Sequence, residues 1–459
     1  MKKILLFLGS ALLLLAGCGG GNDAPDKTKG KKTSGTHARD GVAKKFTDPQ
    51  IEKLAAEANA LLEKGEYVRA KAKMAQAYAA FQGREVDDEA MRIFFLKGFC
   101  KVFDALREDD RAIKYANEVL KLAKTDEDRI IAYGKLGAAC RRKGDFDKAV
   151  ENHQEAQTLA EKVHGANHPA VALSYHQIGK VCHEQGDYVT AIAYHERAVR
   201  IWLEAFGSSH PLIAAAYHGT GAAYAGRGAY GRAITNYEAA LEIWLKAYGE
   251  NHPVTATCYN NLGVALDKDK RIEEAIPYIE KALANRIRAF GPEHPEVASC
   301  YNNLGAALDN KGDYDEAIAN HGKALRIWLK YYGSDHPAVA TTYNNGGGAY
   351  SRKGNYDKAV EYYGKCLAIE LKTLGSEHPD VAITHNNLGN AYEKKGLPDK
   401  AVDHYEKCLA IETKSLPADH PDLADSHYNV GKAYAKRKEK EKALEQERTS
   451  SKAEMEKVS

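Results

Sequence analysis

Histidine is the residue type in this chain whose number and spacing most suggest chemistry. The sequence holds eighteen histidines, and seven of them precede a proline at steps of 42 residues: His168, His210, His252, His294, His336, His378 and His420. Imidazole is a common metal ligand. However, residues that recur once per period occupy equivalent turns along an array and do not converge on a four-coordinate site. His153, His195 and His321 share a phase with tyrosines of other repeats, which predicts a packing role. We therefore expect no metal site and no cofactor.

Cysteine could supply disulfides or reactive thiolates. Six of the eight cysteines form pairs separated by 42 residues: Cys140 and Cys182, Cys258 and Cys300, and Cys366 and Cys408. Equivalent positions in stacked helical repeats lie about 10 Å apart, whereas a disulfide requires Cα atoms within about 7 Å. The cysteines are therefore predicted to be small residues of the core.

The sequence lacks the local signatures of common enzymes. It contains no Gly-x-x-x-x-Gly-Lys phosphate loop, no His-Glu-x-x-His pair and no serine nucleophile elbow. Its 65 basic and 63 acidic side chains nearly cancel, which argues against a nucleic-acid partner. We expect neither catalysis nor a small-molecule substrate.

Asparagine forms the most informative polar pattern. Pairs recur at Asn260 and Asn261, Asn302 and Asn303, Asn344 and Asn345, and Asn386 and Asn387, and Asn429 continues the second position. Asparagine is a mediocre helix former, but its amide offers two donors and an acceptor. A row of such amides could hold the main chain of an extended peptide. Alternatively, asparagine at this offset is generic to the repeat and is only solvated or locally packed.

The elements that position these residues are predicted to be helical hairpins. Apolar residues around Tyr301 and Leu304 have helical spacing, and Lys311-Gly312 ends that helix. A second helix is predicted from about Tyr314 to Tyr332. Pro337 can then open the next helix, where its missing N–H costs nothing.

The offsets of Leu-Gly, the turn glycine, Asp-Tyr, Ala and Ala-Leu resemble the tetratricopeptide repeat. The 42-residue form with Gly-x-x-His-Pro is similar to the repeats of kinesin light chains and their bacterial relatives. This resemblance implies an all-α, right-handed superhelical solenoid. We expect diverged hairpins in 47–129, a regular array in 130–431 and a charged capping helix in 432–459, with about ten hairpins in total.

The resemblance also places the asparagines on the first helix of each hairpin, along a concave groove, and implies that the second asparagine of each pair binds peptide main chain. Mixed charges follow the repeat glycine on the same face: Asp267-Lys268, Asp309-Asn310, Ser351-Arg352 and Glu393-Lys394. We expect Lys268, Arg352 and Lys394 to contribute to partner specificity. These residues do not form the two-lysine, two-asparagine clamp of some chaperone-binding relatives.

The sixth repeat departs from its neighbours at three positions. Lys270 replaces the turn glycine, Pro277 lies early in the second helix, and Arg286 replaces the tryptophan of other repeats. Each change removes a feature that favours the hairpin. This repeat is therefore predicted to be the local weak point of the array.

The N-terminal segment is predicted to be a targeting sequence. Lys2-Lys3 precedes an apolar run too short to span a bilayer, and Leu15-Ala16-Gly17-Cys18 resembles the lipobox of bacterial lipoproteins. The resemblance implies that residues 1–17 are removed and that Cys18 is acylated. The polar composition of 18–46 predicts a disordered tether. Gly19 is not the aspartate that retains many lipoproteins in the inner membrane, so we expect the outer membrane, facing the periplasm, in a two-membrane cell.

Two functions are compatible with these features. The first is a lipid-anchored scaffold at the cell envelope that binds a peptide or protein partner in its groove. The second is a structural or assembly lipoprotein whose lateral surface docks into a secretion, pilus or outer-membrane assembly complex.

Overall fold

The computed structural model describes residues 49–64, 66–82, 88–417 and 420–458, with side chains up to residue 442. The predicted signal peptide 1–17, Cys18 and the tether 18–46 lie outside these residues. Within the described ranges the chain forms nineteen helices and no strand, and none of these helices has the length and apolar character needed to cross a bilayer. The helices divide into two compact units that meet in sequence between Lys270 and Arg271.

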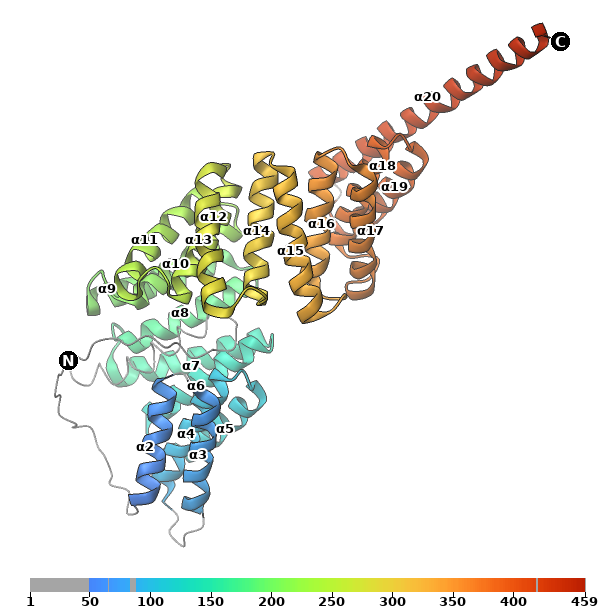
Figure 1. The fold of residues 1–459 in the computed structure, drawn as a ribbon. Helices are drawn as coiled ribbons and strands as arrows, with labels where there is room; N and C mark the ends of the chain where they lie inside the picture. Colours follow the sequence, from blue (N-terminus) through green and yellow to red (C-terminus); the bar gives the residue numbers. More distant parts are fainter. Residues whose placement is uncertain (1–48, 65, 83–87, 418–419, 459) are drawn as a thin grey trace. The chain divides into compact units, whose positions relative to one another are not determined.

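The first unit is built from the helices up to Lys270, coloured blue to green in Figure 1. These are α2 (Pro49–Glu63), α3 (Tyr67–Gln82), α4 (Glu89–Ala105), α5 (Asp109–Leu122), α6 (Asp126–Arg142), α7 (Phe146–His164), α8 (Pro169–Glu184), α9 (Tyr188–Phe206), α10 (Pro211–Gly226), α11 (Tyr230–Tyr248) and α12 (Pro253–Lys268). Consecutive helices pair as hairpins. The first helices of neighbouring hairpins are also in contact: α4 contacts α6, and α6 contacts α8.

The second unit continues the same arrangement. Its helices are α13 (Ile272–Phe290), α14 (Pro295–Lys311), α15 (Tyr314–Tyr332), α16 (Pro337–Arg352), α17 (Tyr356–Thr373), α18 (Pro379–Lys394), α19 (Pro398–Ser415) and α20 (Pro421–Val458). The first helices α14, α16 and α18 again contact one another. The face that they share carries most of the asparagines discussed below.

The hairpin of α14 and α15 has the predicted boundaries. Pro295 opens α14, and Gly312 caps its end with φ near 100°, a left-handed conformation that favours glycine. The second helix runs from Tyr314 to Tyr332, and Pro337 opens α16. The hairpin prediction is therefore confirmed.

Small residues let the helices of each hairpin approach closely. A Cβ on Gly305 would lie 2.8 Å from the ring of His321, and a Cβ on Gly347 would lie 2.8 Å from the ring of Tyr363. The repeat glycine is thus required because an aromatic or imidazole ring of the second helix rests on it. His153, His195 and His321 are each 1% exposed, which confirms their packing role.

The repeated cysteines and tryptophans also belong to the core. The cysteines Cys100, Cys140, Cys182, Cys258, Cys300, Cys366 and Cys408 are buried free thiols. Trp202, Trp244 and Trp328 are buried as well. Because cysteine is small and apolar when protonated, it fills the same space as the alanine or serine of other copies.

The C-terminal end differs from the predicted capping helix in 432–459. Within the described residues the hairpins end with α19, and α20 is a single 38-residue helix that begins at Pro421. In Figure 1 it runs on past the last hairpin. Lys438 occupies the place of the turn glycine, so no residue ends the helix, and the Lys, Glu, Ala and Gln that follow are strong helix formers.

The sixth repeat is strained at its turn. Lys270 has a φ of 67°, one of two positive values found outside glycine in the described chain, and Pro277 lies inside α13. Both features cost free energy of folding. The division of the chain into two units falls at this same turn, which the sequence analysis did not predict.

Candidate functional site: the ladder face of the first helices

The asparagines of the second unit form an amide ladder between neighbouring hairpins. Asn345 Nδ2 donates to Asn302 Oδ1 at 3.3 Å. The same bond joins Asn387 to Asn344 at 2.9 Å and Asn429 to Asn386 at 3.2 Å. Each second asparagine therefore reaches back to the first asparagine of the preceding hairpin. We call each bonded couple an amide pair and the surface that carries them the ladder face.

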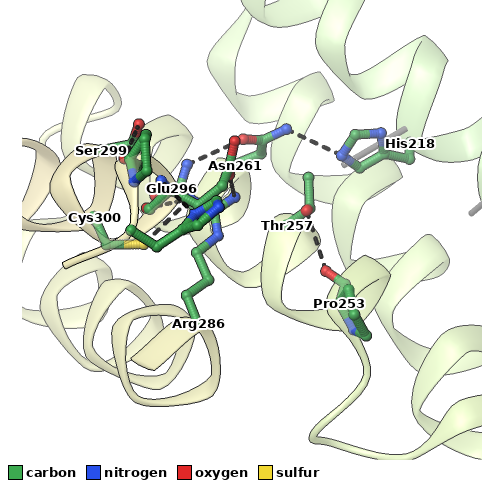
Figure 2. Close-up of polar contacts among 11 residues, drawn as sticks. His218, Pro253, Thr257, Asn261, Arg286, Glu296, Ser299 and Cys300 are labelled. Carbon is green, nitrogen blue, oxygen red and sulfur yellow. Dashed lines mark hydrogen bonds and ion pairs between the residues drawn. The ribbon is translucent and has the colours of Figure 1, made fainter. Parts of the chain in front are cut away.

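The first unit also contains a bond in this register. Asn261 Nδ2 lies 3.0 Å from His218 Nε2, and Figure 2 shows the amide of Asn261 pointing toward this ring. His218 occupies the first-asparagine position of its repeat. Asn260 Nδ2 in turn donates to Asn261 Oδ1 at 3.2 Å. The position therefore links hairpins even where asparagine is replaced by histidine.

The amide pairs keep hydrogen-bonding capacity. In the described part of the chain, Nδ2 of Asn344 and Oδ1 of Asn387 make no hydrogen bond beyond their pair, and both side chains are partly exposed. The free amino group of Asn344 and the free carbonyl oxygen of Asn387 thus remain on this pair as a donor group and an acceptor group. Asn303 already takes part in another interaction, so it is not counted among the residues with free groups. The structure adds to both hypotheses a bonding role between neighbouring hairpins, which the sequence pattern did not reveal.

A second row of contacts crosses the same face two helical turns further on. Arg352 Nε donates to Asp309 Oδ1 at 2.8 Å, and Glu393 contacts Lys432 at 2.9 Å and Lys436 at 2.6 Å. The Asp309 and Glu393 side chains are 4% exposed. Burial alone would raise the pKa of Glu393, but Lys436 and Lys432 lower it. Arg352 is therefore partly committed to an internal ion pair.

Lys268 and Lys394 have a different environment from Arg352. Both lie at the ends of first helices, α12 and α18, and both are exposed. Their ammonium groups can meet a partner without breaking a buried pair. Of the three predicted specificity cations, these two are the more available.

His321 fixes the first amide pair of the second unit. Its Nδ1 lies 3.1 Å from Asn302 Oδ1, the atom that also accepts from Asn345. Burial lowers the pKa of His321 to about 4, so the ring is neutral at pH 7 and its Nδ1 can carry the proton that Asn302 accepts. The packing of this ring on Gly305 thereby orients an amide of the ladder.

The His-Pro histidines cap helices, a role that the sequence analysis missed. The Nδ1 atom accepts the backbone N–H two residues later, as Ala170 donates to His168 at 3.2 Å and Glu296 donates to His294 at 3.2 Å. The ring also stacks on the aromatic residue four positions earlier, for example Phe290 on His294 at 4.6 Å. The signal was available, because the N-cap position precedes a proline at the first helical position.

Arg286 is stabilised by local partners. Its Nη1 donates to the Glu296 carbonyl at 3.1 Å and contacts Cys300 Sγ at 3.4 Å, and its Nη2 lies 3.1 Å from Glu296 Oε2 (Figure 2). The arginine side chain is 7% exposed. The expectation that Arg286 weakens the sixth repeat therefore needs revision, since the buried charge is paired. Lys270 and Pro277 remain as weakening features, and fast local opening stays a prediction.

Among the described residues, no three His, Cys, Asp or Glu side chains are grouped so that they could hold a metal ion. The His-Pro side chains instead each serve their own helix. The tetratricopeptide prediction, by contrast, can be tested by comparison with known proteins.

Solved structures with similar folds include two Rap proteins. The apo form of RapI matches with a TM-score of 0.59 at 14% identity, over 79% of this chain and 98% of that chain. A Rap protein complexed with competence and sporulation factor matches with a TM-score of 0.53 at 14% identity, over 82% and 99%. A putative kinesin light chain repeat protein from Podosopora anserina is 26% identical, over 46% and 99%, with a TM-score of 0.40. A search of curated proteins finds no match.

The family comparison covers most of the chain. The tetratricopeptide repeat model matches overlapping segments at residues 128–202, 183–243, 212–286, 266–310, 308–372, 347–414 and 380–453. These segments include the regular array and the first part of α20. The chain therefore belongs to the tetratricopeptide repeat family.

Proposed function

We propose that this chain is a lipid-anchored scaffold of the cell envelope that binds an extended peptide or protein segment along its ladder face. The observation that carries the proposal is the amide pair that keeps one free donor and one free acceptor, as Asn344 and Asn387 do. Because the pair is bonded before a ligand arrives, its amides are already oriented. Such preorganisation reduces the entropy cost of binding.

The free groups match a peptide backbone. Each peptide unit offers one N–H and one C=O, which complement the free acceptor and donor of one amide pair. Hairpins stacked about 10 Å apart would meet an extended chain every three residues or so, at about 3.3 Å per residue. Contacts of this kind hold main chain without selecting sequence. The exposed cations Lys268 and Lys394 would then favour partners with acidic side chains.

The comparisons support binding as the activity. Tetratricopeptide repeats serve in general as protein-interaction scaffolds, and one structural neighbour is a Rap protein complexed with competence and sporulation factor. Another neighbour, aspartyl phosphate phosphatase F from Bacillus subtilis, is 13% identical with a TM-score of 0.50, which is a likeness of fold. We infer that this chain acts by binding and not by catalysis.

The proposed anchor is the acylated Cys18. Acyl chains contribute about 0.8 kcal/mol per buried methylene, and two or more chains hold a protein stably on a membrane. Cys18→Ser should therefore move the protein from the carbonate-washed membrane pellet to the soluble fraction, with unchanged helix content by circular dichroism. A variant that stays in the pellet contradicts the lipobox assignment and the envelope location based on it.

The binding proposal is tested by removing one complete amide pair. Asn344→Ala/Asn387→Ala deletes both partners of the bond, so no buried amide is left unpaired. Loss of the hydrogen bond lowers the free energy of unfolding by about 1 kcal/mol. The two alanines have a higher helix propensity than the asparagines and raise it by a similar amount, so thermal stability should change little. Two lost ligand hydrogen bonds of about 1 kcal/mol each would weaken binding by roughly 30-fold.

The partner for this titration comes from photocrosslinking in native membranes. A crosslinker at position 341, one turn before Asn345 on the ladder face, is compared with one at position 361 on the exposed side of α17.

The matched control variant for the titration is Asn236→Ala, whose exposed amide bonds only to the Arg232 carbonyl of its own helix. Crosslinks from 361 alone, with unchanged affinity of the double variant, would reject ladder-face binding and favour lateral docking into an assembly complex.

A further inference from the structure

The first half of α20 occupies the place of a first helix, but it has no second helix packed against it. In the preceding hairpin the second helix covers the repeat glycine, so that a Cβ on Gly389 would lie 2.6 Å from the ring of Tyr405. Gly431 is the next glycine of this series. A Cβ placed there would meet no atom within 4 Å in the described part of the chain. The surface that a second helix would cover is therefore open at Gly431.

The open surface extends along α20 at helical spacing. We call it the open face, and it consists of four exposed residues: Ala424, His427, Gly431 and Tyr434. Their equivalents in α18 are buried or partly buried. The Tyr434 side chain is 38% exposed, although its hydroxyl donates to Glu406. An open cavity of about 690 Å³, lined in part by Leu416, Ala424 and His427, lies at the same face. The first half of α20 thus presents a surface that the preceding hairpin buries.

The second half of α20 has the sequence pattern of the missing helix. Ala443 follows Gly431 by twelve residues, as the buried Ala401 follows Gly389. The tetratricopeptide match to residues 380–453 also includes this position. However, α20 is continuous (Figure 1), so residues 439–458 run on for about 30 Å past the position of the turn. In this straight helix they do not cover the open face of their own chain.

We propose that the open face binds the second half of α20 from a second copy of this chain, so that two copies exchange helices. The preceding hairpin predicts the register. Because Gly389 faces Tyr405, that hairpin is centred on residue 397, and the same register in α20 is centred on residue 439. The midpoint of α20, which runs from Pro421 to Val458, coincides with this centre. Two antiparallel copies of α20 therefore pair along their whole length, each covers the open face of the other, and the assembly closes at two copies.

Charge and chain connectivity both favour this occupant. Residues 421–438 carry four basic and two acidic side chains, whereas residues 439–458 carry five basic and six acidic ones. Antiparallel pairing sets the net positive half of each helix against the net negative half of the other. Lys438 replaces the turn glycine, and a straight helix at this hinge directs the second half toward a partner instead of its own chain. The exchange uses neither the amide pairs nor Cys18, so it is independent of the proposed function.

Sedimentation of the full chain in detergent measures the association state. Wild type should form a dimer at micromolar concentration. Gly431→Gln places a side chain where the partner helix rests, but this side chain meets open space in a single copy. The variant should therefore dimerise at least 10-fold more weakly, while its helix content holds or rises. The control is Asp425→Gln, at an exposed position on another side of α20, which should dimerise as wild type does.

Disulfide trapping in the Cys18→Ser background tests the register, since the native cysteines of the described chain are buried. Tyr434→Cys and Leu444→Cys are purified separately, mixed and oxidised. Positions 434 and 444 lie on either side of residue 439 at equal separation, so the mixed disulfide should form faster than either homodimeric one.

Four outcomes would overturn the exchange. The first two are a wild type that stays monomeric and a Gly431→Gln variant that dimerises like wild type. Faster crosslinking between two copies of Tyr434→Cys would indicate parallel helices. A monomeric, intramolecular disulfide as the main product of Tyr434→Cys/Leu444→Cys would show that the chain folds back on its own open face.

Discussion

The buried histidines should make the array sensitive to acid, and His153 provides the cleanest test. Its ring rests on Gly137, where a Cβ would lie 2.6 Å away, and its Nε2 has no hydrogen-bond partner in the described structure. Burial, helped by Arg141 and Lys180, lowers the pKa of His153 to about 3. No carboxylate contributes to that shift, so no neighbouring charge favours protonation of the His153 ring in the folded state.

The sign of the effect follows from the two states. The ring in the unfolded chain titrates near pH 6.5, so between pH 6.5 and 3 the unfolded state binds a proton that the folded state excludes. Its full contribution to stability is present above pH 6.5 and is lost as the pH falls. Between pH 7.5 and 5.0 the loss amounts to about 2 kcal/mol, because 1.5 pH units at 1.36 kcal/mol each separate pH 5.0 from the unfolded value.

His153→Phe removes this titration while it keeps a ring on Gly137. Hydrogen exchange of α6 and α7, corrected for intrinsic rates, measures their opening free energy at both pH values. Wild type should lose about 2 kcal/mol more than the variant between pH 7.5 and 5.0. The control is His427→Phe, at an exposed position of α20, which should behave as wild type. Identical pH dependence in His153→Phe and wild type would refute the reasoning.

Three further substitutions test local features. Lys270→Gly should stabilise the sixth repeat by about 1 kcal/mol in urea unfolding, because it relieves a positive φ; a destabilised variant would show that the turn is not strained. Arg286→Ala should cost about 2–3 kcal/mol through loss of its bonds to Glu296, and Glu296→Gln should cost less. His252→Ala should cost about 1 kcal/mol and His252→Asn much less, since asparagine is also an N-cap; equal losses would exclude capping.

Repetition explains why most of the fold could be predicted from the sequence. Each position of the repeat occurs several times in the chain, so the residue types found there show what its environment accepts. Ala317 or Gly305 can therefore be interpreted together with six or seven equivalent residues. The boundaries of α14 and α15 follow from such signals. Burial of Cys366 and Trp202 could be deduced in the same way.

Features that occur once could not be predicted in this way. Arg286 and its carboxylate partner Glu296 occupy positions where no other repeat of the array carries Arg or Glu, respectively. The continuous α20 results from one missing glycine, at position 438. The adjacent asparagines could be recognised as a repeated pattern in the sequence. The hydrogen bonds of the amide pairs, however, join residues 43 apart, and a period of 42 residues does not show which positions of neighbouring repeats face each other.

The bonds between hairpins connect stability to binding within each unit. A solenoid owes its stability to repeats and to the interfaces between neighbours, and the amide pairs and the Arg352–Asp309 contact are such interfaces. A peptide that bonds the free groups of successive pairs would span several hairpins and stabilise them together. Its binding would be weakest where an interface is already strained.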